Sequence, residues 1–298
     1  MKKVLVVYYS QSGQLRRIAE RFMRGFEDTS IAVDWYEIKP VEDFPFPWTD
    51  AAFFGAFPES YLQVPQALQP IPESIAEKDY DLIVLAYQVW YLSPSIPITS
   101  FLKSEAGKRL IAGKSVITLS GTRNMWVQAQ KKVKALLSGV GAELVGNIAL
   151  TDRHANHISV ITIVQWMFSG NPEPKQRWLP KAGVSEDDIK GAAAYGELAS
   201  YYTLQGDYAP LQRELVARGA VHLKPFLLSA EKKGNRLFGI WARLIYGSPR
   251  REFLLKCFRA YLYVAIWVLM PIVALLYWLT YPLAYKKIRR EMQEARGV

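Results

Sequence analysis

The 298-residue chain has a single cysteine, Cys257, and only three histidines. One cysteine excludes an internal disulfide framework, which fits a reducing compartment. With so few histidines and cysteines we expect no metal site. The N-terminus also lacks a secretory signal, because the apolar run after Lys3 is short and ends in a glycine turn. No Gly-x-Gly-x-x-Gly fingerprint is present, so nothing indicates a dinucleotide site. We therefore expect a protein whose bulk starts in the cytosol.

Most of the chain carries equal numbers of basic and acidic side chains, and the net charge of +10 comes from one part of it. Residues 1–152 carry 16 basic and 16 acidic side chains, and residues 153–231 carry 8 of each. Residues 232–298 carry 13 basic and 3 acidic side chains, which accounts for the whole surplus. The same tail holds an uncharged, mostly apolar run of 26 residues, 260–285. As a helix this run would span about 39 Å, against about 30 Å for a bilayer core. The tail therefore indicates a membrane partner and no nucleic acid.

Five short apolar runs predict buried parallel strands. They are Val4–Tyr9, Ala32–Ile38, Asp81–Tyr87, Ser115–Ser120 and Glu143–Leu150. Helical spacing of apolar residues from 15 to 26 and from 126 to 140 places helices between strands. This alternation predicts an α/β fold with a doubly wound parallel sheet, in the order 2-1-3-4-5, with ligands at the carboxyl ends of the strands.

The strands divide the chain into three parts. Residues 1–152 are predicted to form the α/β domain, residues 153–231 a helical extension and residues 232–298 a basic, membrane-binding tail. In the extension, Ser185 begins a helix that runs to about Leu204, and 208–218 forms a second. In the tail, 232–259 has the spacing of an amphipathic helix on a bilayer surface.

Residues 39–80 interrupt the strand–helix rhythm with seven prolines and, from Phe44 to Tyr61, seven large aromatic residues. Long segments of this kind are functional or disordered, and the aromatic content argues against disorder. The segment is either a lid beside the site or a layer packed over the sheet edge.

The strongest local signal is the turn Ser10-Gln11-Ser12-Gly13-Gln14-Leu15, which joins the first strand to a helix. Such a turn offers backbone N–H groups and the positive end of the helix dipole to a phosphate, while serine hydroxyls add donors. Gly13 permits a positive φ or a close approach. The turn has no lysine, so it is not a nucleotide-hydrolysing P-loop. It is otherwise an ordinary strand–turn–helix connection.

Two later loops follow strands that end at the same edge. The third strand runs into Gln88-Val89-Trp90-Tyr91, where an aromatic ring could stack on a flat cofactor or belong to the core. The fourth strand ends in Ser120-Gly121-Thr122-Arg123-Asn124. Arg123 either stabilises negative charge on a reduced cofactor or is solvated.

Together these loops resemble the FMN site of flavodoxin-like proteins. Ser10, Ser12 and Gly13 match the family's phosphate loop, whereas Leu15 stands where a hydroxyl is usual. The resemblance implies that residues 10–15, 88–91, 120–122 and 124 bind FMN, with Arg123 beside it. After the fifth strand, His154 and His157 reach the same edge and could move a proton at neutral pH, or be merely structural.

The whole layout resembles the dialkylresorcinol condensing enzymes, on the segment YYSQSGQL and on the total length. This implies oxidation of a lipid-like cyclic diketone to a dialkylresorcinol, next to a ketosynthase-type partner, at the cytoplasmic face of the inner membrane. No condensing nucleophile is visible. Alternatives are an NAD(P)H:quinone reductase, a membrane-tethered electron-transfer flavodoxin, and a flavin-free scaffold.

The apolar run has basic residues on both sides, which places both ends in the cytoplasm by the positive-inside rule. Pro271 divides the run into arms of 11 and 14 residues. We therefore expect residues 260–285 to enter the membrane as a bent hairpin. A single tilted span is the alternative.

Overall fold

The computed structural model describes residues 1–298 and contains a five-stranded parallel sheet in the order β2-β1-β3-β6-β7. The strands are β1 (Lys2–Tyr8), β2 (Ile31–Glu37), β3 (Leu82–Tyr87), β6 (Ser115–Thr122) and β7 (Glu143–Thr151). In chain order this is 2-1-3-4-5, the order of flavodoxin-like folds. The fold class predicted from the sequence is confirmed, with strand ends differing by one or two residues.

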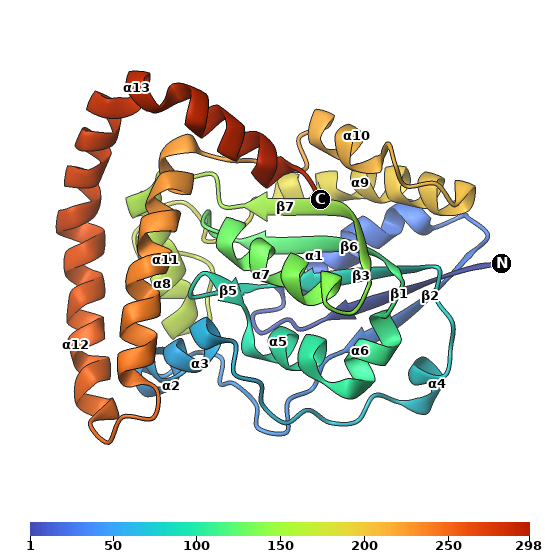
Figure 1. The fold of residues 1–298 in the computed structure, drawn as a ribbon, viewed down its shortest axis with the longest axis horizontal. Coiled ribbons are helices and arrows are strands. Elements are labelled where there is room, and N and C mark those ends of the chain that lie inside the picture. The colour runs from blue at the N-terminus through green and yellow to red at the C-terminus, as the bar shows by residue number, and fades with distance from the viewer.

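Helices cover both faces of the sheet (Figure 1). One face packs against α1 (Gln14–Met23), η1 (Arg24–Phe26), α9 (Glu186–Gln205) and α10 (Leu211–Ala217). The other face packs against α5 (Ile96–Lys103), α6 (Glu105–Ile111) and α7 (Val127–Ser138). The central strands β1 and β3 are buried on both sides, which explains their continuous apolar runs, whereas the edge strand β2 is partly exposed.

The extension after residue 152 contributes to the same core as the strands. It contains α8 (Asn156–Ser169), α9 and α10, and side chains of α9 and α10 join the cluster around β1, β3 and β6. As the sequence predicts, the Ser185 hydroxyl caps α9 by accepting a hydrogen bond from the Asp188 amide. A Cβ on Gly196 would lie 1.8 Å from the Phe22 carbonyl oxygen, so glycine is required where α9 crosses α1.

Residues 39–80 form a packed layer with three short helices, α2 (Asp50–Gly55), α3 (Phe57–Leu62) and α4 (Glu73–Ala76). Its aromatic side chains reach inward, and Trp48 and Phe57 are buried. The layer also holds the C-terminal helices, because Arg251 forms a bidentate ion pair with Glu59, and the ring of Phe57 stacks on that of Phe258 at 3.7 Å.

The C-terminal part differs from the sequence prediction at two places. The single amphipathic helix expected over 232–259 is instead α11 (Pro225–Ile245) followed by α12 (Arg251–Val264), with a turn at Gly247 where φ is +73°. The predicted reversal at Pro271 is wrong. The chain stays helical through η2 (Ala265–Leu269), a π-helical turn, into α13 (Met270–Arg296).

The change of direction comes further along, inside α13, as Figure 1 shows at the top of the view. Pro282 is the proline within this helix, and an internal proline kinks a helix because it removes a hydrogen bond and crowds the preceding turn. Pro271 lies in the first turn of α13 instead, directly after the wider π turn that accommodates it.

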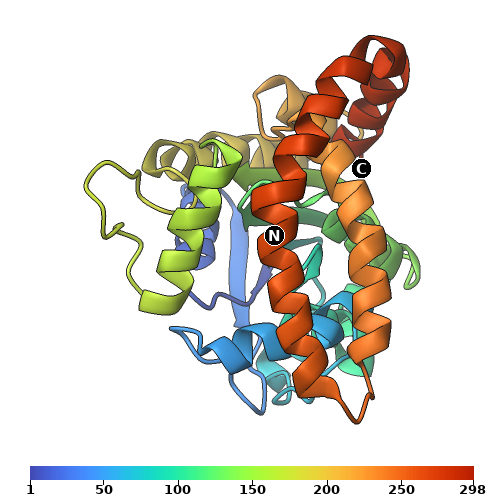
Figure 2. The ribbon, with the colours of Figure 1, turned by 90° about the vertical axis from the view of Figure 1, so that its left-hand side faces the viewer.

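The residues from 251 to 296 form one helix that is long and apolar enough to cross a membrane, judged by length and composition. Only 6% of its most apolar window is buried. Figure 2 shows the molecule from the side at which the strands have their carboxyl ends, and α8, α11 and α12 lie in front of the sheet. The apolar helix is therefore placed over the edge at which a parallel sheet of this kind binds ligands.

Candidate functional site at the carboxyl edge of the sheet

The turn between β1 and α1 is free to bind an anion. Gly13 has φ +80° and caps α1 without a side-chain hydrogen bond. The backbone N–H groups of Gln11, Ser12 and Gly13 donate no hydrogen bond within the chain, and the Ser12 hydroxyl makes none. The Ser10 hydroxyl accepts from the Arg16 amide at 3.2 Å. A cluster of unpaired N–H groups at a helix N-terminus is a ready site for a phosphate.

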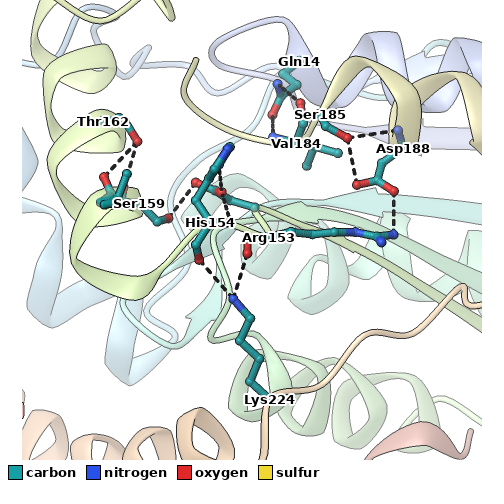
Figure 3. A network of polar contacts seen from close by, with 11 residues as sticks. Gln14, Arg153, His154, Ser159, Thr162, Val184, Ser185, Asp188 and Lys224 are labelled. Atoms are coloured by element: carbon teal, nitrogen blue, oxygen red, sulfur yellow. Dashed lines mark hydrogen bonds and ion pairs between the residues drawn. The ribbon is translucent and has the colours of Figure 1, made fainter. Parts of the chain in front are cut away.

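Three side chains of this turn make contacts with other parts of the protein. The Gln14 side chain donates to the Val184 carbonyl and accepts from the Val184 amide, which joins the turn to the extension (Figure 3). Leu15 is buried in the core, which explains the missing hydroxyl and leaves only its backbone N–H for a ligand. The Gln11 side chain donates to the Pro45 carbonyl at 3.0 Å. The side chains of Gln11, Gln14 and Leu15 thus make contacts within the protein, and the binding of FMN by residues 10–15 stays a prediction.

Next to this turn lies a cavity of about 420 Å³ on the β2 side. Besides Tyr9, Ser10 and Gln11 it is lined by Glu37 and Asp43, with Lys39 as the only cation. The two carboxylates disfavour a phosphate there, so an anion is better accommodated at the free N–H groups of the turn.

The loop after β3 is a strained hairpin that buries Trp90. Its strands β4 (Val89–Trp90) and β5 (Ser93–Pro94) are joined by Tyr91 and Leu92, both with positive φ, a conformation that favours glycine or asparagine. Trp90 packs edge-on against three aromatic rings, Tyr9 at 6.1 Å, Phe44 at 4.9 Å and Trp48 at 5.2 Å.

The other side chains of this loop connect it to neighbouring elements at the carboxyl edge of the sheet. The Tyr91 hydroxyl donates to the Phe53 carbonyl at 2.6 Å, so its ring belongs to the packed layer. The Gln88 side chain donates to the Tyr9 carbonyl at 3.1 Å and joins the ends of β1 and β3. Val89 packs beside the cluster that contains Trp126.

Several buried polar atoms at the end of β6 and in the loop that follows it have no hydrogen-bond partner. The Ser120 hydroxyl, both amide atoms of Asn124 and the Trp126 indole N–H make no hydrogen bond, and Ser120 and Trp126 are almost fully buried. Because buried polar groups are paired in nearly all proteins, these groups are available to a polar ligand or to water. The next two residues of β6 have structural roles. Gly121 allows the Ile18 side chain to pack closely against the strand, and the Thr122 carbonyl accepts a hydrogen bond from the Asp152 amide.

The structure pairs His154 with a carboxylate that the sequence analysis did not single out. Asp152 is fully buried at the end of β7, and its Oδ1 lies 2.7 Å from His154 Nδ1. Asp152 also accepts from the His154 amide and from the Ser159 hydroxyl. In the tautomer that carries its proton on Nδ1, the imidazole donates to Asp152 and its Nε2 can accept a proton.

The loop that carries His154 is held from three sides, as Figure 3 shows. Lys224 Nζ donates to the carbonyl oxygens of Arg153 and His154, both at 3.0 Å. The Arg153 guanidinium pairs with Asp188 of α9 at 2.6 Å. These contacts hold the backbone that carries the imidazole.

Arg123 reaches the same loop, where its guanidinium donates to the Asn156 side chain at 3.0 Å. Burial lowers the pKa of Arg123 to about 10, while the carboxylates of Asp152 and Glu231 act in the opposite direction. Arg123 thus stays charged at neutral pH and is held near Asp152. Glu231 comes from α11, and burial raises its pKa to about 7.

His157 faces the long apolar helix of residues 251–296. Its Nε2 lies 3.2 Å from the Ile266 carbonyl oxygen, and its ring packs on Trp267 at 5.5 Å. In the π register the donor for Ile266 would be residue 271, which is a proline and has no N–H. His157 therefore supplies the donor that Pro271 lacks, and it holds the helix in place.

No protein-family model matches the chain, and no curated protein matches it. Among solved structures it is similar to a flavoprotein in complex with FMN from Lactobacillus acidophilus, with 20% identity over 50% of this chain and 93% of the other and a TM-score of 0.41. It is also similar to a flavoprotein described from Bacteroides eggerthii, with 18% identity over 55% and 98% of the chains and a TM-score of 0.41. An NAD(P)H:quinone oxidoreductase from Methanothermobacter marburgensis is 10% identical over 66% and 98%, with a TM-score of 0.34.

Proposed function

We propose that this protein is a membrane-associated, FMN-dependent oxidoreductase that aromatises a lipid-like cyclic diketone to a dialkylresorcinol. The observation that carries the proposal is the convergence at one sheet edge of a free phosphate loop, unpaired buried polar groups and a His–Asp pair. An exposed apolar helix lies over that edge.

The residues at the edge fit FMN. The free N–H groups of Gln11, Ser12 and Gly13 would hold its single phosphate, and the Ser12 hydroxyl adds a donor. Ser120, Asn124 and Trp126 would satisfy the polar edge of the flavin ring. When bound, FMN supplies a two-electron acceptor for a hydride from the substrate.

Aromatising a cyclohexanedione removes one hydride and one proton from the ring. His154 is the residue for the proton, because Asp152 orients its ring and stabilises the imidazolium that forms. Arg123 supplies positive charge for an oxygen that gains electron density during the step. His157 is not needed for the proton, since its Nε2 is bonded to the helix.

The substrate class follows from the helix over the edge. Leu275, Trp278, Leu279 and Leu283 are each more than 60% exposed, which is far more apolar surface than a helix of a water-soluble protein shows. A dialkyl substrate would reside in a bilayer, so an anchored site would receive it there. Basic residues on both sides of the apolar run would place the FMN domain at the cytoplasmic face of the inner membrane. A ketosynthase-type enzyme is the partner that would supply the diketone.

The proposal is tested by mixing the purified holoprotein anaerobically with candidate cyclic diketones and, separately, with NADPH, while the flavin absorption band is followed. Diketone-dependent bleaching with formation of a resorcinol supports the proposal. Bleaching by NADPH but by no diketone would instead support an NAD(P)H:quinone reductase. Bleaching by neither substrate would support an electron carrier, and a colourless protein would support a scaffold.

A further inference from the structure

A second cavity shares no lining residue with the cavity beside the β1–α1 turn. It has a volume of about 280 Å³ and lies between the first turn of α7, the first half of α11 and the last turns of α13. Its charged lining comprises Lys131, Lys232, Lys287, Arg290, Glu291 and Glu294.

The charges of this cavity favour an anion. Four cationic side chains face two carboxylates. Lys232 is paired with Glu291 at 2.9 Å and Arg290 with Glu294 at 3.6 Å, but Lys131 and Lys287 make no ion pair. The N–H group of Gln128, in the first turn of α7, is already bonded to Glu231, so an anion here would be held by the lysine and arginine side chains.

The cavity is also next to the apolar surface. Lys287 and Arg290 come directly after the uncharged run, which ends at residue 285. Leu283 is 92% exposed and lies one helical turn before Lys287, at about 6 Å along the axis. Leu279, 69% exposed, continues the same row one turn further away. An anion in the cavity would thus be at the level where an apolar chain along α13 would meet water.

We propose that this cavity binds the phosphate of an anionic phospholipid whose acyl chain lies along α13. The proposal rests on the membrane association in the proposed function. Two unpaired lysines disfavour the cationic choline group of the zwitterionic phosphatidylcholine headgroup and favour a headgroup that adds no positive charge, such as phosphatidylglycerol. The bound lipid would fix the end of α13 at the bilayer surface.

The test uses the full-length protein in detergent micelles with equal amounts of phosphatidylcholine and phosphatidylglycerol, and native mass spectrometry to count bound lipids. We expect one retained phosphatidylglycerol per chain, preferred about tenfold, since each lysine contributes roughly a few-fold in affinity. The double variant Lys131→Gln/Lys287→Gln should lose this preference. The control Lys233→Gln/Lys256→Gln removes the same charge from exposed lysines of the tail that do not line the cavity, and should keep it.

Three results would overturn the headgroup site. They are no preference in the protein without substitutions, an equal loss in the control variant, or displacement of the lipid by inorganic phosphate. The last would indicate a site for free phosphate. Flotation with vesicles of phosphatidylcholine alone reports membrane association separately. A chain that floats but shows no preference contradicts only the headgroup site, whereas a chain that does not float contradicts membrane association as well.

Discussion

Glu231 offers a quantitative test of how the C-terminal helices join the domain. Its side chain comes from α11, is 2% exposed, and accepts a hydrogen bond from the Gln128 amide at 2.7 Å. Burial raises its pKa from 4.5 to about 7, even though the backbone N–H groups and the positive charges of Lys131 and Arg123 lower it. The variant Glu231→Gln keeps an acceptor for the amide but cannot ionise.

The size of the effect follows from the two pKa values. Each pKa unit is worth about 1.4 kcal/mol, so a rise of roughly two and a half units corresponds to about 3 kcal/mol. Because the folded state holds the proton more tightly, stability is greatest below pH 4.5. It falls as the pH rises to about 7, and is constant above that. The glutamine variant should therefore match the original protein near pH 4.5 and exceed it by up to about 3 kcal/mol at pH 8.

Thermal unfolding of the full-length protein in mild detergent at several pH values measures this difference. The expected result is a stabilisation by Glu231→Gln that grows between pH 4.5 and 7. The matched control is Glu294→Gln, which removes an exposed carboxylate of α13 and should show no such trend. A constant difference across the pH range, or a loss of stability at pH 8, would refute the assignment of Glu231 as a buried, partly protonated group.

Three further predictions concern the site. Ser12→Glu should abolish FMN retention by placing a carboxylate against the phosphate, whereas Ser138→Glu, on an exposed serine of α7, should purify with full flavin; equal flavin content in both would exclude the loop. His154→Ala should lower turnover by about 10²-fold or more with flavin still bound, and unchanged turnover would exclude it as the base. His157→Ala should instead speed hydrogen exchange in residues 264–272 and change turnover of a water-soluble analogue by less than about threefold. A loss of turnover as large as that of His154→Ala would reassign His157 to the chemistry.

The sheet could be predicted because the central strands β1 and β3 are apolar runs buried on both faces, and because strands alternate with helices along the chain. The turn between β1 and α1 could be predicted because its geometry is local, with Gly13 at a φ of +80° directly before the helix, and its binding of a phosphate stays a prediction. Pro271 misled the prediction because a proline is tolerated in the first turn of a helix, and η2 and His157 compensate for it.

The rest of the site depends on contacts that are distant in the sequence. Gln14 meets Val184 across 170 positions, Gln128 meets Glu231 across 103 and His157 meets Ile266 across 109. No local pattern marks such pairs. Asp152 is only two residues from His154, but its role depends on burial at the end of β7, which an alternation of residue types does not reveal.

The most direct test of the account is the identity of the cofactor. The full-length protein is purified in mild detergent and denatured, and the released small molecules are identified and counted by mass spectrometry. The account predicts one FMN per chain, because the free turn at Ser12 and Gly13 accommodates a single phosphate. Stoichiometric FAD, or no flavin even after incubation with FMN, would contradict it.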